Sequence, residues 1–341
     1  MSGRRFYLIC LPHQLLNKIV GHNGLQKTTF IFLMIARMTM LQQFWQRSSD
    51  YLTLLKPRVM SLVVFTALVG TILAPGSIGL INATVAVVAI AIGAGAAGAI
   101  NMWYDRDIDA IMRRTLHRPL PKERLHPAEA LSLGIALSVI SVWVLATQVN
   151  TISAALLAIT ILYYVIIYTV WLKRRTPQNV VIGGVSGALP PVIGWSAVTG
   201  SIDPGAIFLF AVIFLWTPPH SWALAIFRQG DYSAASVPML PVAAGRHATA
   251  VQILIYSILL IPVTLLPLPM GLSGLIYEIA AITLGIGFSI HVWRLFRTLS
   301  APISGDKDAQ VARKLFSYSV RYLFLIFLAL IADSFILTAI S

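Results

Sequence analysis

The sequence predicts an all-α membrane protein with about nine transmembrane helices, and three observations lead to this fold class. Apolar residues make up 57% of the 341 positions and charged residues only 11%, whereas soluble domains carry roughly 25% charged residues. Several apolar runs reach about 20 residues, the length that crosses the hydrocarbon core as a helix. No segment alternates as a barrel strand does, so helices must satisfy the backbone.

Nine segments meet the length and hydropathy requirements of a transmembrane helix. Their approximate limits are 59–75, 81–101, 130–148, 151–171, 179–198, 205–226, 248–268, 272–293 and 319–340. Two of them carry closely spaced glycines, which allow helix backbones to approach one another. These glycines are Gly93, Gly95 and Gly98 in the second segment, and Gly183, Gly184 and Gly187 in the fifth.

The basic residues predict the orientation. Of the 25 lysines and arginines, eight precede the first span, and six, three, two and six lie in the 2–3, 4–5, 6–7 and 8–9 connections. The other connections hold none. Because lysine and arginine mark cytoplasmic loops, we expect a cytoplasmic amino terminus and an external carboxyl terminus. The host membrane is expected to be a bacterial inner membrane, with the mitochondrial inner membrane as the alternative.

Residues 1–49 form a basic extension that we expect to be separate from the transmembrane domain at 50–341. The extension has no acidic residue before Asp50, as in mitochondrial presequences. The alternative is an upstream start, with Met38 or Met40 as the true first residue. Under either interpretation the extension is expected to be dispensable for catalysis. The single cysteine, Cys10, excludes an internal disulfide and cysteine-based metal or haem attachment motifs.

Acidic residues cluster at the end of the second span. Asn101, Asp105 and Asp109 are spaced four apart, which places them on one helical face. Mg²⁺ binds one or two carboxylates and takes its remaining ligands from water and substrate phosphate. The alternative is a solvated helix end in which Asp109 pairs with Arg113. Both interpretations treat the carboxylates as surface groups that contribute little to folding.

The same membrane side is predicted to carry further charged groups. Arg118, Lys173 and Arg174 offer the donors that a diphosphate needs, although such runs also occur as orientation signals alone. Asp231 in the 6–7 connection supplies another carboxylate. An apolar central cavity beneath these charges would suit a prenyl diphosphate, whose leaving group needs neutralisation and whose carbocation needs protection from water.

His220 follows Pro218 and Pro219 at the expected end of the sixth span. It could bond to backbone that the prolines leave free. Trp216 is expected to be a membrane-interface aromatic.

Several motifs resemble the UbiA-type intramembrane prenyltransferases over residues 50 to 340, and more narrowly the branch that farnesylates haem. The motifs are Lys56-Pro-Arg-Val59, Asn101 to Asp109, Arg174 to Asn179, Trp216 to His220, and Asp231-Tyr232 with Pro238 to Pro241. The resemblance implies farnesyl transfer from farnesyl diphosphate to a vinyl group of haem B, with addition of water. Haem B is then a substrate, not a prosthetic group.

The resemblance also implies roles for individual residues. Asn101, Asp105, Asp109 and Asp231 would form the catalytic site, with the three aspartates on Mg²⁺. Arg118, Lys173, Arg174 and His220 would bind substrate. With haem as the acceptor, His220 could contact the haem iron, a propionate or the diphosphate. Ala235 stands where ring-prenylating relatives usually carry a second acid.

The implied partners are membrane lipid and a haem A synthase or terminal oxidase assembly factors. No nucleic-acid partner is expected. The alternatives are a prenyltransferase acting on an aromatic quinone precursor and a polytopic transporter. Against the transporter, almost no ionisable residue except Asp333 lies in the middle of a predicted span, and the acidic residues lie at one face.

Overall fold

The computed structural model describes residues 24–302 and 305–340 of the chain. The chain divides into two compact units, residues 1–49 and 50–341. The described part of the first unit is the helical segment 24–49, which belongs to helix α2 (Gly24–Leu54). That the first unit is dispensable stays a prediction. The second unit carries the transmembrane helices and all the site residues.

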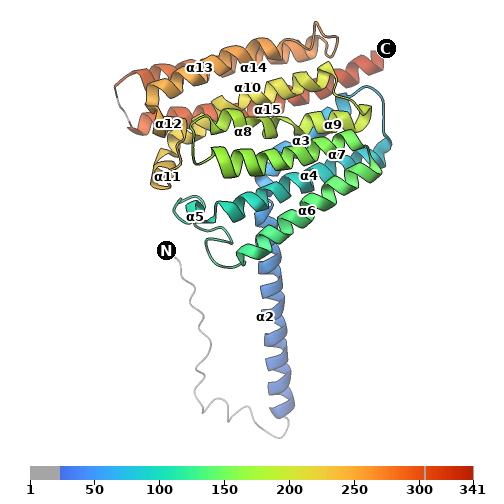
Figure 1. Cartoon of the computed structure of the whole chain (residues 1–341), viewed down its shortest axis with the longest axis vertical. Coiled ribbons are helices and arrows are strands. Elements are labelled where there is room, and N and C mark those ends of the chain that lie inside the picture. Colours follow the sequence, from blue (N-terminus) through green and yellow to red (C-terminus); the bar gives the residue numbers. More distant parts are fainter. Residues whose placement is uncertain (1–23, 303–304, 341) are drawn as a thin grey trace. The chain divides into compact units, whose positions relative to one another are not determined.

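The second unit is a bundle of long helices (Figure 1), and the described residues contain no strand. The long elements are α3 (Pro57–Leu73), α4 (Gly79–Tyr104), α6 (Pro127–Gln148), α7 (Thr151–Leu162) continued by the π-helix η1 (Tyr163–Leu172), α8 (Asn179–Ala188), α9 (Pro190–Thr199), α10 (Pro204–Phe227), α13 (Gly245–Thr264), α14 (Leu275–Ser300) and α15 (Gly305–Ile340). Three short helices join them, namely α5 (Arg106–Asp109), α11 (Gln229–Ala234) and α12 (Leu240–Ala243).

The all-α membrane fold is confirmed. Among the described residues, eight helical segments are long and apolar enough to cross a membrane, or nine if the pair 36–54 and 57–73 counts as one span. The predicted limits differ most at the carboxyl end. Arg294 and Arg297 lie on α14, and Lys307, Arg313 and Lys314 lie on α15, so most of the predicted 8–9 connection is helical.

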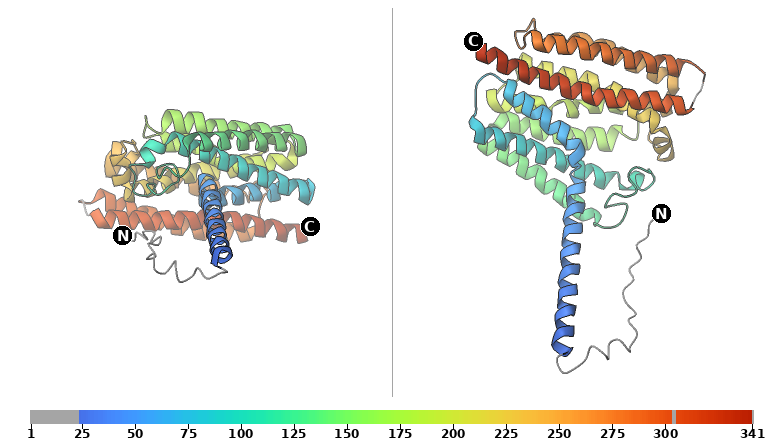
Figure 2. Two further views of the ribbon diagram at one scale, coloured as in Figure 1. Left: turned by 90° about the horizontal axis from the view of Figure 1, so that it is seen from below. Right: turned by 180° about the vertical axis from the view of Figure 1, so that it is seen from behind.

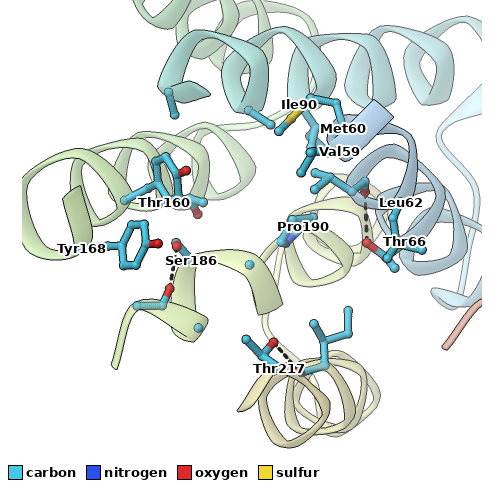
Figure 3. A pocket seen from close by; sticks show the side chains of 18 of the residues that line it. Val59, Met60, Leu62, Thr66, Ile90, Thr160, Tyr168, Ser186, Pro190 and Thr217 are labelled. Atoms are coloured by element: carbon cyan, nitrogen blue, oxygen red, sulfur yellow. Dashed lines mark hydrogen bonds between the residues drawn. The ribbon is translucent and has the colours of Figure 1, made fainter. Parts of the chain in front are cut away.

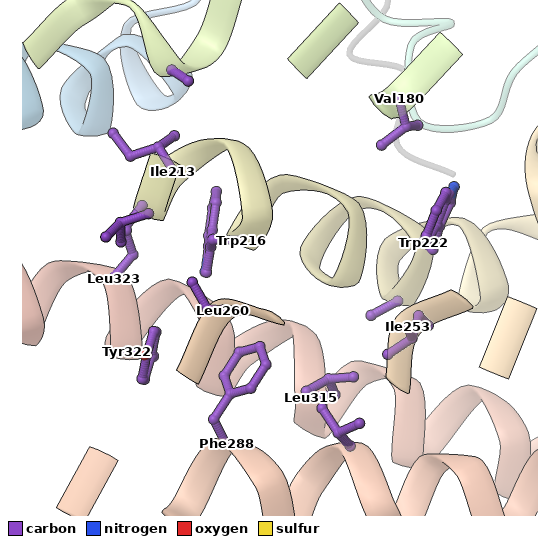
Figure 4. Packing of buried hydrophobic residues seen from close by; sticks show 14 of the residues in the cluster. Val180, Ile213, Trp216, Trp222, Ile253, Leu260, Phe288, Leu315, Tyr322 and Leu323 are labelled. Atoms are coloured by element: carbon purple, nitrogen blue, oxygen red, sulfur yellow. The ribbon is translucent and has the colours of Figure 1, made fainter. Parts of the chain in front are cut away.

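Small residues bring helices together, but at glycines outside the two predicted sets; within those sets, added β-carbons would mostly meet side chains. A β-carbon at Gly70 of α3 would overlap the Pro191 backbone, and one at Gly194 of α9 would overlap the Ala67 backbone. These two glycines therefore hold α3 and α9 in backbone contact. The apolar core lies mainly around α10, where Trp216 and Trp222 are 6% and 0% exposed (Figure 4).

The short helices gather at one end of the bundle. In Figure 1, α5, α11 and α12 lie at the left end, and the view from behind in Figure 2 shows the same arrangement. The 2–3 and 6–7 connections therefore meet although about 120 residues separate Arg113 from Asp231 in the chain, as their hydrogen bond requires. This end of the bundle holds the charged residues singled out above.

Candidate active site

The acidic motif continues the helical path of α4. Helix α4 ends at Tyr104, but Asp105 N–H donates to the Asn101 carbonyl at 2.9 Å and Asp109 N–H donates to the Asp105 carbonyl at 2.8 Å. The Asn101 amide also donates to Asp105 Oδ2 at 2.7 Å. The four-residue spacing is therefore kept across the transition into α5. It allows a direct hydrogen bond between the side chains of Asn101 and Asp105.

The carboxylates are buried, which corrects the expectation that they are surface groups. Asp105 is 1% exposed and Asp109 4%. Removing one partner of a buried ion pair destabilises a protein by about 3 to 5 kcal/mol. Neutralisation of Asp105 or Asp109 is therefore expected to affect folding as well as turnover.

Each buried carboxylate has a basic partner from another part of the chain. Lys173, just after η1, forms an ion pair with Asp105. Arg118 Nη1 lies 2.5 Å from Asp109 Oδ2. The predicted alternative pairing of Asp109 with Arg113 is wrong, because Arg118 occupies this carboxylate.

Arg174 is directed mainly toward the rim of the site. It binds both oxygens of the exposed Asp107 at 2.7 Å and donates to the Tyr104 carbonyl at 3.1 Å. Its contact with Asp105 is longer, at 3.5 Å. The hydrogen bonds from Arg174 lower the pKa of Asp107, and the same pairing raises the pKa of Arg174.

Lys56 is a further cation that spacing alone did not indicate. It precedes α3 with a left-handed backbone (φ 51°, ψ 53°), which costs a non-glycine residue about 1–2 kcal/mol. Its ammonium donates to Asn101 Oδ1 at 2.6 Å. Burial lowers the pKa of Lys56 to about 7, helped by Arg118 and Lys173 and opposed by Asp109 and Asp105. A bound anion would favour its charged form.

The second acidic loop is joined to the first. Arg113 N–H donates to Asp231 Oδ1 at 3.2 Å. Arg114 donates to the Tyr232 hydroxyl at 3.0 Å and its guanidinium lies 4.9 Å from the centre of the Tyr232 ring. The structure thus places Asp231 at the same end of the bundle as the Asn101 motif, in agreement with the predicted common face.

The donor set fits a metal that takes few protein ligands. Within residues 24–302 and 305–340, no three His, Cys, Asp or Glu side chains are grouped to hold one ion. At this end of the bundle, the buried carboxylate oxygens Asp105 Oδ1 and Asp231 Oδ2 have no hydrogen-bond partner among the described residues. Mg²⁺ bound by one or two carboxylates, with phosphate and water as further ligands, is compatible with this arrangement.

An apolar cavity of about 370 Å³ lies within the bundle (Figure 3). Val59, Met60 and Ile90 line one wall, and Thr160, Tyr168 and Ser186 line another. The hydroxyls of Thr160, Ser186 and Thr217 donate to carbonyls of their own helices. The walls are therefore mostly hydrocarbon with a few hydroxyl oxygens.

The π-helix η1 connects this cavity to the charged cluster. Tyr164 and Tyr168 line the cavity with their rings stacked 5.2 Å apart. The next residue, Thr169, is fully buried and accepts a hydrogen bond from the Asn101 amide at 3.0 Å. Four residues later comes Lys173, the partner of Asp105. The charged groups therefore lie at one end of the apolar cavity.

His220 lies inside α10, because the two prolines do not end this helix. It lines the cavity, and its Nδ1 lies 2.8 Å from Ser319 Oγ of α15. The expected bond to backbone freed by the prolines is absent from the described contacts. The imidazole is stacked between Trp216 and Phe316, with centroid distances of 4.2 and 4.6 Å. Trp216 is thus a core residue, which corrects its assignment to the membrane interface.

Comparison with known proteins agrees with this geometry. Residues 63–319 match the UbiA prenyltransferase family. The chain is 52% identical over 294 residues to protoheme IX farnesyltransferase 2 of Mesorhizobium japonicum, covering 86% of this chain and 92% of that relative. It is also 52% identical over 291 residues to the protoheme IX farnesyltransferase of Granulibacter bethesdensis, covering 85% and 92%.

Solved structures share the fold at low sequence identity. A digeranylgeranylglyceryl phosphate synthase is 18% identical with a TM-score of 0.69, covering 84% of this chain and 98% of that one. A UbiA homologue from Archaeoglobus fulgidus bound to DMAPP and Mg²⁺ is 17% identical with a TM-score of 0.57, covering 83% and 99%. Together with this shared fold, the family match over residues 63–319 and the relatives at 52% identity show that the chain belongs to the UbiA prenyltransferase family.

Proposed function

We propose that this chain transfers the farnesyl group of farnesyl diphosphate to a vinyl group of haem B. The curated relatives that are about half identical over most of the chain bear the name protoheme IX farnesyltransferase. The observation that carries the proposal is the apolar cavity with buried carboxylates and cations at one end. Such a site suits a molecule with a hydrocarbon tail and an anionic head.

The bonds and charges of the reaction balance without a redox change. The bond from farnesyl C1 to oxygen breaks, and the electron pair leaves with diphosphate. The terminal vinyl carbon forms a bond to C1, and the positive charge moves to the carbon beside the porphyrin. Water adds there and loses a proton, which gives the hydroxyethylfarnesyl side chain of haem O. This last step is the finer part of the proposal.

The diphosphate is proposed to bind at the charged cluster. Lys173 and Arg118, aided by Lys56, would donate to phosphate oxygens, because these three cations face the buried motif. Arg174 would contribute from the rim. One or two of the carboxylates of Asp105, Asp109 and Asp231 would hold Mg²⁺, which when bound neutralises charge on the leaving diphosphate. Asn101 would orient Asp105 and Lys56 through its two hydrogen bonds.

The acceptor haem is proposed to meet the cavity near His220, whose ring is aromatic-stacked and faces the apolar lining. The cavity walls exclude water from the carbocation until the vinyl group attacks. Tyr164 and Tyr168 present stacked rings beside the charged end, where the allylic cation would form.

The chain is an integral membrane protein. We propose that its active-site end faces the cytoplasm of a bacterial cell, since the basic residues of the 2–3 and 6–7 connections gather there. A haem A synthase or terminal oxidase assembly factors would consume the product.

Product analysis tests the proposal. Purified protein is incubated with haem B, farnesyl diphosphate and Mg²⁺ in ¹⁸O-labelled water, and haem is examined by mass spectrometry. The expected product carries one farnesyl group and one labelled hydroxyl oxygen. Unmodified haem together with a prenylated hydroxybenzoate or naphthoate, when these are supplied, would refute haem as the acceptor and leave the prenyltransferase assignment intact.

A further inference from the structure

The hydrogen bonds around Ser319 determine which nitrogen of His220 carries a proton. A serine hydroxyl has one hydrogen to donate. Ser319 Oγ donates to the Phe316 carbonyl at 2.7 Å, one turn earlier on α15. When this hydrogen goes to Phe316, the contact with His220 Nδ1 at 2.8 Å is one in which the imidazole donates. The Nδ1–H tautomer of His220 is thus the form that satisfies both contacts of Ser319 Oγ, and it leaves the lone pair on Nε2.

The surroundings also fix the ring. Trp216 and Phe316 lie against its two faces, with interplanar angles of 19° and 28°. Stacking determines the plane of the ring, and Ser319 determines which edge points to α15. Ser319 itself is held in place, because it is 0% exposed and its carbonyl accepts a hydrogen bond from Trp216 Nε1 at 2.8 Å.

We propose that Ser319 is a positioning residue that presents Nε2 of His220 to the iron of the acceptor haem. Neutral imidazole with its second nitrogen hydrogen-bonded is the form in which histidine binds metals, and the partner of that second nitrogen sets tautomer and orientation. No described residue forms a hydrogen bond with Nε2, and His220 lines the cavity. The inference rests on the proposed function, since it takes haem B as the acceptor.

Direct observation of the tautomer is the first test. Histidine ¹⁵N spectra of the full chain in detergent are expected to show an unprotonated Nε2 at His220, assigned by comparison with His220→Ala. A protonated Nε2 in the ligand-free protein would overturn the inference without any variant of Ser319.

Haem binding is the second test. Titration of haem B into the full chain is expected to give a histidine-ligated absorption spectrum that His220→Gly loses and added imidazole restores. Ser319→Ala should weaken haem affinity by about 10- to 100-fold, the usual effect of removing the partner of a metal-binding histidine. Ser319→Thr keeps the hydroxyl and should recover affinity. Ser257→Ala is the matched control, because it removes an equally buried hydroxyl that bonds its own helix on α13.

Three outcomes distinguish failure of this inference from failure of the proposed function. If wild-type protein farnesylates haem B but Ser319→Ala binds haem with unchanged affinity and spectrum, only the role of Ser319 is refuted. The iron contact is likewise refuted if His220→Gly keeps the histidine-ligated spectrum. If wild-type protein yields no farnesylated haem, the proposed function fails, and the inference falls with it.

Discussion

Neutralising Asp109 is expected to strengthen the binding of farnesyl diphosphate when no metal is present. In the ligand-free protein Arg118 is already paired with Asp109 at 2.5 Å, and Asp109 is 4% exposed. A diphosphate that arrives without a divalent cation must displace this carboxylate from the guanidinium. Asp109→Asn removes the competing negative charge at nearly constant side-chain volume.

The size of the effect follows from the contact that is exchanged. A hydrogen bond to a charged group contributes about 1.5–3 kcal/mol, and each 1.4 kcal/mol corresponds to about tenfold in a dissociation constant. Metal-free affinity should therefore rise by about 10- to 100-fold. With Mg²⁺ the sign should reverse, because the variant has lost a proposed metal ligand, and turnover should fall by orders of magnitude.

Calorimetric titration with an unreactive thio analogue of farnesyl diphosphate, in EDTA and in Mg²⁺, measures both effects. Asp107→Asn is the matched control. Asp107 also pairs with an arginine, but its side chain is 60% exposed, and exposed pairs contribute only about 0–1 kcal/mol. Metal-free binding that is unchanged or weaker in Asp109→Asn, in protein shown to be folded, would refute the proposed exchange of partners.

Three further results are expected. Gly183→Ala should destabilise the protein by about 1–3 kcal/mol and lower turnover, since a β-carbon there overlaps the Tyr168 ring. Gly187→Ala is the control and should leave thermal unfolding in detergent unchanged, because no atom lies within 4 Å of a β-carbon at that position. In protein lacking Cys10, a cysteine at the exposed Ser77 should react with an impermeant reagent from outside and one at the exposed Ser233 should not; the reverse would refute the orientation. A chain that begins at Met38 should keep its turnover when normally inserted, and loss of turnover would show that the extension is needed.

The fold could be predicted from the sequence because the bilayer imposes a strict length and hydropathy on each span. The predicted spans agree with the helices to within a few residues except at α14 and α15, which continue past the membrane-length apolar runs. A helix can continue beyond the point where the hydropathy of the sequence falls. For this reason basic residues such as Arg297 and Lys307 were expected in a connection but lie on helices.

The charged motif was also visible in the sequence, because i, i+4 spacing survives at Asp105 and Asp109. Burial was not. A carboxylate at the end of an apolar segment looks solvated until a lysine 68 residues away is brought against it. The sequence contains only a weak indication that Lys56 belongs to the site, because this lysine directly precedes a proline at the start of a predicted transmembrane helix. The sequence contains no indication of a role for Ser319, since it is an ordinary small residue in an apolar helix and acts only through His220.

The π-helical winding of η1 explains how one segment serves both the cavity and the charged cluster. In an α-helix, residues five apart point about 140° away from each other, at 100° per residue. In η1 the Lys173 N–H instead donates to the Tyr168 carbonyl at 2.9 Å, and the Thr169 hydroxyl donates to the Tyr164 carbonyl, also at 2.9 Å. These five-residue contacts bring Lys173 and Thr169 over the two tyrosines that line the cavity. Lys173, which would receive the diphosphate, and the rings that would face the allylic cation are thereby placed one turn apart. π-Helical segments are frequent at functional sites.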